Sequence, residues 1–135
     1  MGIRYEHSIP EKEAFFALFE TTGWNAKYNF TPDNLAKAVR NSYFMVCAYS
    51  GAQLIGTGRI ISDGIYQTLI ADMIVHPDYQ QQGIGSEILT MLIAKCQRDG
   101  MKQIQLASAK GKIGFYKKYG FEARPADAPG MQKYL

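Results

Sequence analysis

Three apolar, β-rich runs separated by two short turns constrain the fold of this chain most strongly. The runs cover residues 43–49, 53–61 and 66–75, and the turns are Ser-Gly at 50–51 and Ser-Asp-Gly at 62–64. Serine, aspartate and glycine are typical turn residues, and connections this short join antiparallel neighbours. The sequence therefore predicts a three-stranded antiparallel meander.

A long amphipathic helix is predicted over residues 85–98, and Asp99-Gly100 ends it. Its apolar stripe consists of Ile84, Ile88, Leu89, Leu92, Ile93 and Cys96. Residues 103–107 then form a further predicted strand. Because a helix connects this strand to residues 66–75, the two strands should be parallel.

The N-terminal part predicts one short strand and two helices. Residues 3–6 form the strand, and Ser8 is expected to open a helix with Glu11 completing a capping box. Residues 21–30 interrupt the helical pattern with rings and amides, which indicates a loop. Thr31 and the proline after it open a second helix.

The C-terminal part predicts a short helix over residues 112–119, ended by Gly120. Residues 121–135 are expected to hold two weak strands, split by Pro125 and Pro129. The element order predicts an α+β fold. Its sheet would be mixed and mostly antiparallel, with helices on both faces.

Size and composition narrow the class of protein. The chain has 135 residues, of which 47% are hydrophobic and 20% charged, so a single domain over residues 1–135 is expected. A net charge of +3 is too small to indicate nucleic-acid binding. The two cysteines, Cys47 and Cys96, lack metal-ligand spacing, so no metal is predicted. Neither a signal peptide nor a membrane-length apolar run is present, so a cytoplasmic protein is expected.

The stretch HPDYQQQGIGSEIL, residues 76–89, joins the last meander strand to the long helix. The first N–H groups of a helix have no internal partner, and the helix dipole makes that end positive. Two glycines there either open the backbone to a phosphate group or only form a tight corner. A dinucleotide fingerprint needs a third glycine where Ile88 stands, and the Gly-Lys-Ser/Thr of a triphosphate-binding loop is missing.

This stretch resembles the acetyl-CoA signature of the GNAT superfamily of N-acetyltransferases, Arg/Gln-x-x-Gly-x-Gly/Ala. Gln80, Gly83 and Gly85 fill the pattern. A second segment, FYKKYGF at residues 115–121, resembles the closing Phe-Tyr-x-x-x-Gly-Phe of the family. The element order is similar to the GNAT core over essentially the whole chain, which implies a GNAT-like sheet with a splayed pair of parallel strands.

The resemblance implies acetyl-CoA as co-substrate, with its pyrophosphate on main-chain N–H groups at the helix start. The residues expected to bind the pyrophosphate are Gln81, Gln82, Gly83, Ile84, Gly85 and Ser86. Gln80 would shape the loop. The pantetheine arm would pair like an extra strand with the backbone of Met73, Ile74 and Val75.

The resemblance also places Tyr116 near the thioester sulfur. A phenol is protonated at neutral pH, so it can supply the proton that the leaving thiolate needs. The other interpretation of Tyr116 is a packed aromatic residue. Asp72 is the candidate base, on the same strand face as Ile70 and Ile74 by alternation. A buried carboxylate held by backbone or arginine contacts is the alternative.

The last helix departs from the family pattern. Many members carry Asn-x-x-Ala before the Phe-Tyr pair, where this chain has Ala109 and Lys112. Lys110, Lys112 and Lys117 would either meet the nucleotide phosphates of CoA or form a solvated helix face.

The family usually builds its acceptor site from the loop between the first two helices and from the central strands. The residues at these places are Trp24, Asn25, Tyr28 and Phe30, with Tyr43 and Arg59 from the strands. Such rings suit a small or aryl-bearing amine, or they pack as a lid on the core.

The leading function is transfer of an acetyl group from acetyl-CoA to a primary amine of a small molecule, by direct attack in a ternary complex. The alternatives are a non-catalytic acyl-CoA sensor and an enzyme that acetylates a protein or peptide amine. No nucleic-acid or membrane partner is expected. An edge strand in the C-terminal tail would allow a homodimer.

Overall fold

A computed structural model describes residues 2–135 of the chain, which fall into two compact units. The first unit ends at Gln105 and contains β1 (Arg4–His7), α1 (Lys12–Glu20), the 3-10 helix η1 (Trp24–Lys27), α2 (Pro32–Arg40), β2 (Phe44–Ser50), β3 (Gln53–Ser62), β4 (Thr68–Val75), the 3-10 helix η2 (Pro77–Tyr79) and α3 (Ile84–Arg98). The second unit, Leu106–Leu135, contains α4 (Ile113–Lys117). That both units form one domain stays a prediction.

The sheet of the first unit is a four-stranded antiparallel meander in the order β1-β2-β3-β4. The predicted meander is therefore confirmed, and its strands begin and end within two residues of the expected positions. β4 lies at one edge of the sheet, because β3 is its only neighbour among the named strands.

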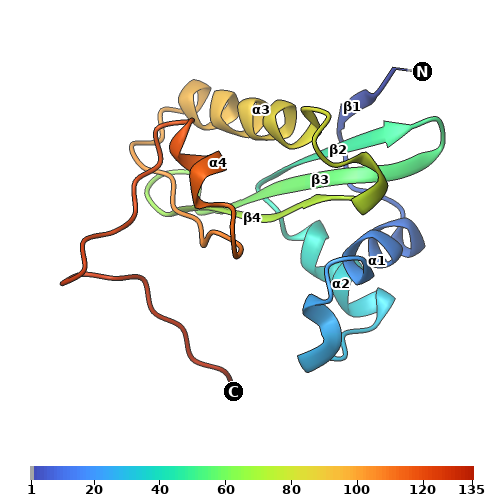
Figure 1. Cartoon of the computed structure of the whole chain (residues 1–135), viewed down its shortest axis with the longest axis horizontal. Coiled ribbons are helices and arrows are strands. Elements are labelled where there is room, and N and C mark those ends of the chain that lie inside the picture. The colour runs from blue at the N-terminus through green and yellow to red at the C-terminus, as the bar shows by residue number, and fades with distance from the viewer. Residues whose placement is uncertain (1) are drawn as a thin grey trace. The chain divides into compact units, whose positions relative to one another are not determined.

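Helices cover both faces of this sheet, as predicted. In Figure 1, α1 and α2 lie on one side of the strands and α3 lies on the other. The core on the first side consists of Phe15, Leu18, Phe19, Leu35, Val39, Met45, Cys47, Leu54 and Ile74. On the other side α3 buries five of the six residues of its predicted stripe, Ile84, Ile88, Leu89, Leu92 and Cys96. The mixed α+β fold is confirmed.

The start of α1 differs from the prediction. Ser8 does not open the helix: Glu11 is the N-cap residue, and its carboxylate accepts hydrogen bonds from the N–H groups of Glu13 and Ala14. The reason is Pro10, because a residue before proline is disfavoured in the α conformation. The second predicted helix start is confirmed, since Thr31 caps α2 in a capping box with Asn34.

The predicted strands after α3 were largely wrong. Residues 103–107 contribute one parallel bridge, in which Gln105 pairs with Leu69. Its N–H donates to Thr68 O and its carbonyl accepts from the Ile70 N–H, both at 2.9 Å. Residues 121–135 form no strand. The tail therefore offers no edge strand for the expected homodimer.

Gly58 sets how closely β3 approaches α3. A Cβ atom on this glycine would lie 2.6 Å from Met73 Sδ, 2.7 Å from Ile88 Cγ2 and 2.9 Å from Leu92 Cδ1. Real Cβ atoms essentially never lie this close to other heavy atoms. The absence of a side chain therefore lets the helix pack directly on the strand.

Gly58→Ala is expected to lower the free energy of unfolding by about 1–3 kcal/mol, because overpacking a filled core strains three side chains at once. Thermal or urea unfolding measures the change. Gly130→Ala is the control, since a Cβ there meets nothing within 4 Å. Equal unfolding curves for the two variants would contradict this account of the packing.

Candidate active site

The junction between β4 and α3 is an exposed loop with two left-handed residues. Gln81 has φ +63° and Gly83 has φ +82°. A positive φ is uncommon for a residue with a side chain, so the backbone at Gln81 is held in a costly conformation. The residues from Gln81 to Gly83 are exposed, and Gly83 is the N-cap of α3 without any side-chain capping bond.

The main-chain donors of this loop are free. In residues 2–135, no hydrogen bond uses the N–H of any residue from 81 to 86. The first bond at this end of α3 runs from the Glu87 N–H to Gly83 O, at 3.1 Å. Ser86 adds a hydroxyl that makes no hydrogen bond within the described chain. Free N–H groups at the positive end of a helix form a site suited to a phosphate.

Gln80 lies where it can shape this loop. Its side-chain Nε2 donates to Val75 O at 3.0 Å and so ties the loop to the last residue of β4. The predicted partners of the pantetheine arm, Met73, Ile74 and Val75, all lie in β4, the edge strand. A carbonyl oxygen has two lone pairs, so the Gln80 bond leaves Val75 able to accept a second hydrogen bond.

β4 carries a β-bulge that the sequence did not predict. Thr57 is paired with Ile74 and Arg59 with Ala71, so Asp72 and Met73 together lie opposite the single residue Gly58. Asp72 has φ +53°, in the left-handed region. An extra residue in one strand bends that strand and leaves part of its backbone out of the ladder.

The bulge changes which side chains share a face. Ile74 belongs to the core beneath α1 and α2. Ile70 is paired with Ile60, two residues beyond Gly58, and therefore faces α3. The prediction that Asp72 shares one face with both isoleucines was therefore wrong. The extra residue of the bulge shifts the alternation of side chains between Ile70 and Ile74.

The carboxylate of Asp72 is held by Arg59. Arg59 Nε lies 2.6 Å from Asp72 Oδ2, and the two side chains are only 12% and 20% exposed. Arg59 Nη1 also donates to Ala38 O at 3.2 Å and to Ser42 Oγ at 3.3 Å. The geometry matches the alternative in which arginine holds this carboxylate, and the role of Asp72 as base stays a prediction.

The main chain at Asp72 is held as well. Thr57 is fully buried, and its hydroxyl donates to Asp72 O at 3.0 Å. In a trans peptide the carbonyl of one residue and the N–H of the next point in opposite directions, and the described chain has no cis peptide. The Met73 N–H therefore points away from the Thr57 hydroxyl, which makes it a candidate donor to a bound carbonyl.

Tyr116 lies in the second unit, on α4. It is 8% exposed, and its ring contacts Phe115 and Phe121 edge-on, with centroids 5.1 and 5.9 Å away. Burial raises the pKa of the Tyr116 phenol above its ordinary value. The group is therefore protonated at neutral pH, as a general acid must be. Lys110, the predicted phosphate partner, is an exposed turn residue before α4.

The loop between α1 and α2 presents aromatic rings to solvent. Trp24, Tyr28 and Phe30 are 37%, 45% and 41% exposed, and the rings of Tyr28 and Phe30 stack at 5.1 Å. Asn25 is buried instead. Its amide closes the loop by donating to Phe30 O at 2.9 Å and accepting from the Phe30 N–H at 2.8 Å. This geometry gives Asn25 a structural role, while acceptor contacts by Trp24 and Tyr28 stay predictions.

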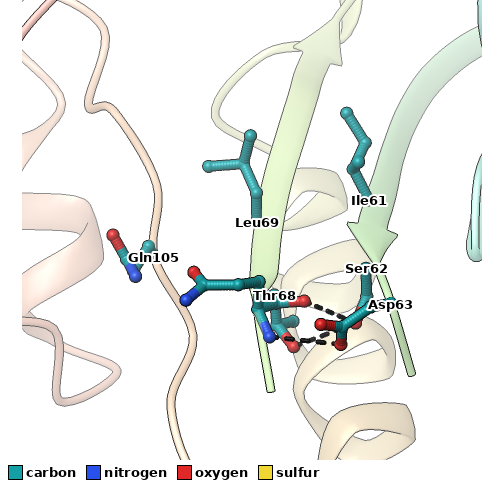
Figure 2. A pocket seen from close by; sticks show the side chains of 7 residues that line it. Ile61, Ser62, Asp63, Thr68, Leu69 and Gln105 are labelled. Atoms are coloured by element: carbon teal, nitrogen blue, oxygen red, sulfur yellow. Dashed lines mark hydrogen bonds between the residues drawn. The ribbon is translucent and has the colours of Figure 1, made fainter. Parts of the chain in front are cut away.

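A separate hollow of about 340 Å³ lies at the first residues of β4, beside the turn that connects β3 to β4 (Figure 2). It is lined by Ile61, Ser62, Asp63, Gln67, Thr68, Leu69 and Gln105. Asp63 Oδ1 accepts hydrogen bonds from three main-chain N–H groups of the turn, which lower the pKa of the Asp63 carboxyl. The Asp63 carboxylate thus stabilises the turn. None of the residues predicted for the active site lines this hollow.

No group of three or more His, Cys, Asp or Glu side chains in residues 2–135 is arranged to hold a metal ion. No described helix is both long enough and apolar enough to cross a membrane.

Known proteins resemble this chain in sequence and in fold. The model of the acetyltransferase (GNAT) domain family matches residues 12–131. A Glycine max protein named histone acetyltransferase TAP1 is 32% identical over 129 residues, which cover 87% of this chain and 54% of that protein. The chain thus spans about half the length of this curated relative.

Solved structures agree with the family match. A probable acetyltransferase of unknown function from meticillin-resistant Staphylococcus aureus has a TM-score of 0.89 and 27% identity, covering 99% of this chain and all of that one. The PaiA N-acetyltransferase of Thermoplasma acidophilum, solved with coenzyme A, has a TM-score of 0.73 and 17% identity, covering 92% of each chain. This second likeness shows the fold alone.

The sequence and the fold are those of an acetyltransferase (GNAT) domain. The chain belongs to the GNAT acetyltransferase family.

Proposed function

We propose that this chain transfers the acetyl group of acetyl-CoA to a primary amine of a small molecule within a ternary complex. The observation that carries the proposal is the row of unpaired N–H groups at residues 81–86, at the start of α3. They suit the pyrophosphate of CoA, the ligand of the Thermoplasma acidophilum neighbour. No metal is part of the proposal.

The residues of the site have distinct roles in the proposed reaction. The amine nitrogen attacks the acetyl carbonyl carbon, a C–N bond forms, and the C–S bond breaks. The Met73 N–H donates to the carbonyl oxygen as negative charge develops there. Tyr116 donates its phenolic proton to the leaving sulfur, and the amine releases its own proton to Asp72 or to water.

Exposed rings support a small amine as acceptor. Trp24, Tyr28 and Phe30 form an aromatic surface in the loop between α1 and α2, suited to an aryl-bearing or alkyl amine. The name of the soybean relative favours a second candidate, a protein or peptide amine. A cytoplasmic location is likewise proposed from the sequence alone.

A panel of amines incubated with acetyl-CoA tests the proposal, with released CoA thiol measured by DTNB. Cys47 and Cys96 are both buried, and burial raises the pKa of the Cys47 thiol to about 12 and that of Cys96 above its ordinary value. The protein's own thiols should therefore add little signal. The panel contains aryl amines, alkyl amines and lysine-bearing peptides.

Turnover with small amines is the expected result. Turnover with peptides alone would indicate that the natural acceptor is an amine of a protein or peptide. Binding of acetyl-CoA without turnover on any amine would favour a sensor, and absence of CoA binding would overturn the proposal.

A further inference from the structure

We propose that Arg59 and Thr57 are positioning residues that fix the bulge in β4 and thereby aim the Met73 N–H at the acetyl carbonyl. This inference rests on the proposed function and assigns a role to two residues that do not touch the reacting atoms. The two side chains come from alternate positions of one strand, β3, on either side of Gly58, and both hold Asp72.

Asp72 needs to be held because its backbone is in an unfavourable conformation. Its φ of +53° lies in the left-handed region, which aspartate tolerates better than most residues but still at a cost. Such a conformation persists only when surrounding contacts determine it. The contacts here are a buried hydroxyl on the carbonyl oxygen and a guanidinium on the carboxylate.

The two contacts fix different parts of the same residue. The Thr57 hydroxyl sets the direction of the Asp72 carbonyl and, through the planar peptide, the direction of the Met73 N–H. Arg59 fixes the position of the Asp72 carboxylate. Because Arg59 also donates to Ala38 O and Ser42 Oγ, it anchors the bulge to the end of α2 and the residues after it.

Lysine cannot reproduce the Arg59 contacts. The guanidinium reaches Asp72 through Nε while Nη1 reaches two other acceptors, whereas an ammonium is a single point charge. Arg59→Lys therefore keeps the charge that balances Asp72 and loosens its position. Thr57→Val changes the shape little and removes only the hydroxyl that holds the carbonyl.

The expected result is a selective loss of turnover. In both variants kcat should fall about 10- to 100-fold, the scale of an active-site group displaced by about 1 Å. The affinity for CoA, which lacks the acetyl carbonyl, and the KM of the amine should stay unchanged. If both residues act through one bulge, the double variant should lose less than the product of the single losses.

A readout at the bulge separates positioning from simple stabilisation. In the ¹⁵N-labelled wild-type protein, the Met73 amide signal should move further with acetyl-CoA than with CoA. That difference should vanish in Arg59→Lys and Thr57→Val, while circular dichroism confirms that both are folded. Lys12→Gln is the matched control, because it removes an ion pair at 2.9 Å on the surface of the same unit.

Three results would overturn the assignment. One is an unchanged kcat in a folded Thr57→Val protein. Another is an effect of Arg59→Lys confined to the KM of the amine, which would make Arg59 an acceptor contact. A third is a wild-type protein that binds neither CoA nor acetyl-CoA, since that failure removes the proposed function as well. The first two leave the proposed function intact, so the failures are distinguishable.

Discussion

Gly83→Val is expected to weaken the binding of CoA about 10- to 100-fold, the cost of losing roughly one hydrogen bond to a charged group. Gly83 caps α3 with φ +82°, and a Cβ there would meet no protein atom within 4 Å. A valine would therefore project into open space beside the free N–H groups. Its branched side chain would also resist the positive φ and so disturb the direction of those donors.

Gly100 provides the matched control at the other end of the same helix. It has φ +74° and equally open surroundings. Gly83→Val and Gly100→Val should therefore lose similar thermal stability, about 1–3 kcal/mol for a side chain forced into a left-handed conformation. Titration calorimetry with CoA should separate the two variants. Equal affinities would show that the N-terminal donors do not bind the pyrophosphate.

Tyr116→Phe is expected to lower kcat about 100-fold or more, the usual contribution of a general acid, while CoA still binds. The substitution keeps the ring that packs against Phe115 and Phe121 and removes only the hydroxyl. Tyr119→Phe is the control, since Tyr119 also contacts the Phe115 ring, at 5.6 Å. Steady-state kinetics with one amine and acetyl-CoA measures both variants.

The pH dependence of kcat adds a second test of Tyr116. Burial raises the pKa of its phenol above the ordinary value of about 10. The acid form therefore prevails throughout the neutral and mildly alkaline range, and its loss should begin only above that ordinary value. An alkaline loss of activity centred well below it, or a fully active Tyr116→Phe protein, would assign the proton to another group.

Much of the fold could be predicted because its strongest patterns are local. The apolar stripe of α3 repeats over four turns, and the turns of the meander contain residues whose chemistry favours reversal of the chain. The capping pattern at Ser8 does not mark the start of α1, because Pro10 restricts the backbone conformation of Ile9. The tail strands failed because proline there removes main-chain donors.

For the candidate site, the sequence pattern indicates free main-chain donors at the helix start, while the roles of the individual residues stay predictions. The glycine pattern at residues 83–85 indicates a helix start, and the structure leaves its N–H groups free. The bulge at Asp72 was missed because alternation assumes a period of two, which an extra residue breaks. Two features of the sequence indicate the bulge: Asp72 is a charged residue inside an apolar strand, and Gly58 is a glycine in the strand before it.

The exposure of Gln81 and Gln82 has a consequence for divergence among related chains. In the proposed binding mode the peptide backbone contacts the pyrophosphate, so exchanges at Gln82, which lacks a positive φ, should be nearly neutral for cofactor affinity. At positions 81 and 83 the backbone conformation limits the choice of residue, because only residues that tolerate a positive φ fit there. Related chains should therefore vary in the side chains of this loop and keep the same backbone conformation.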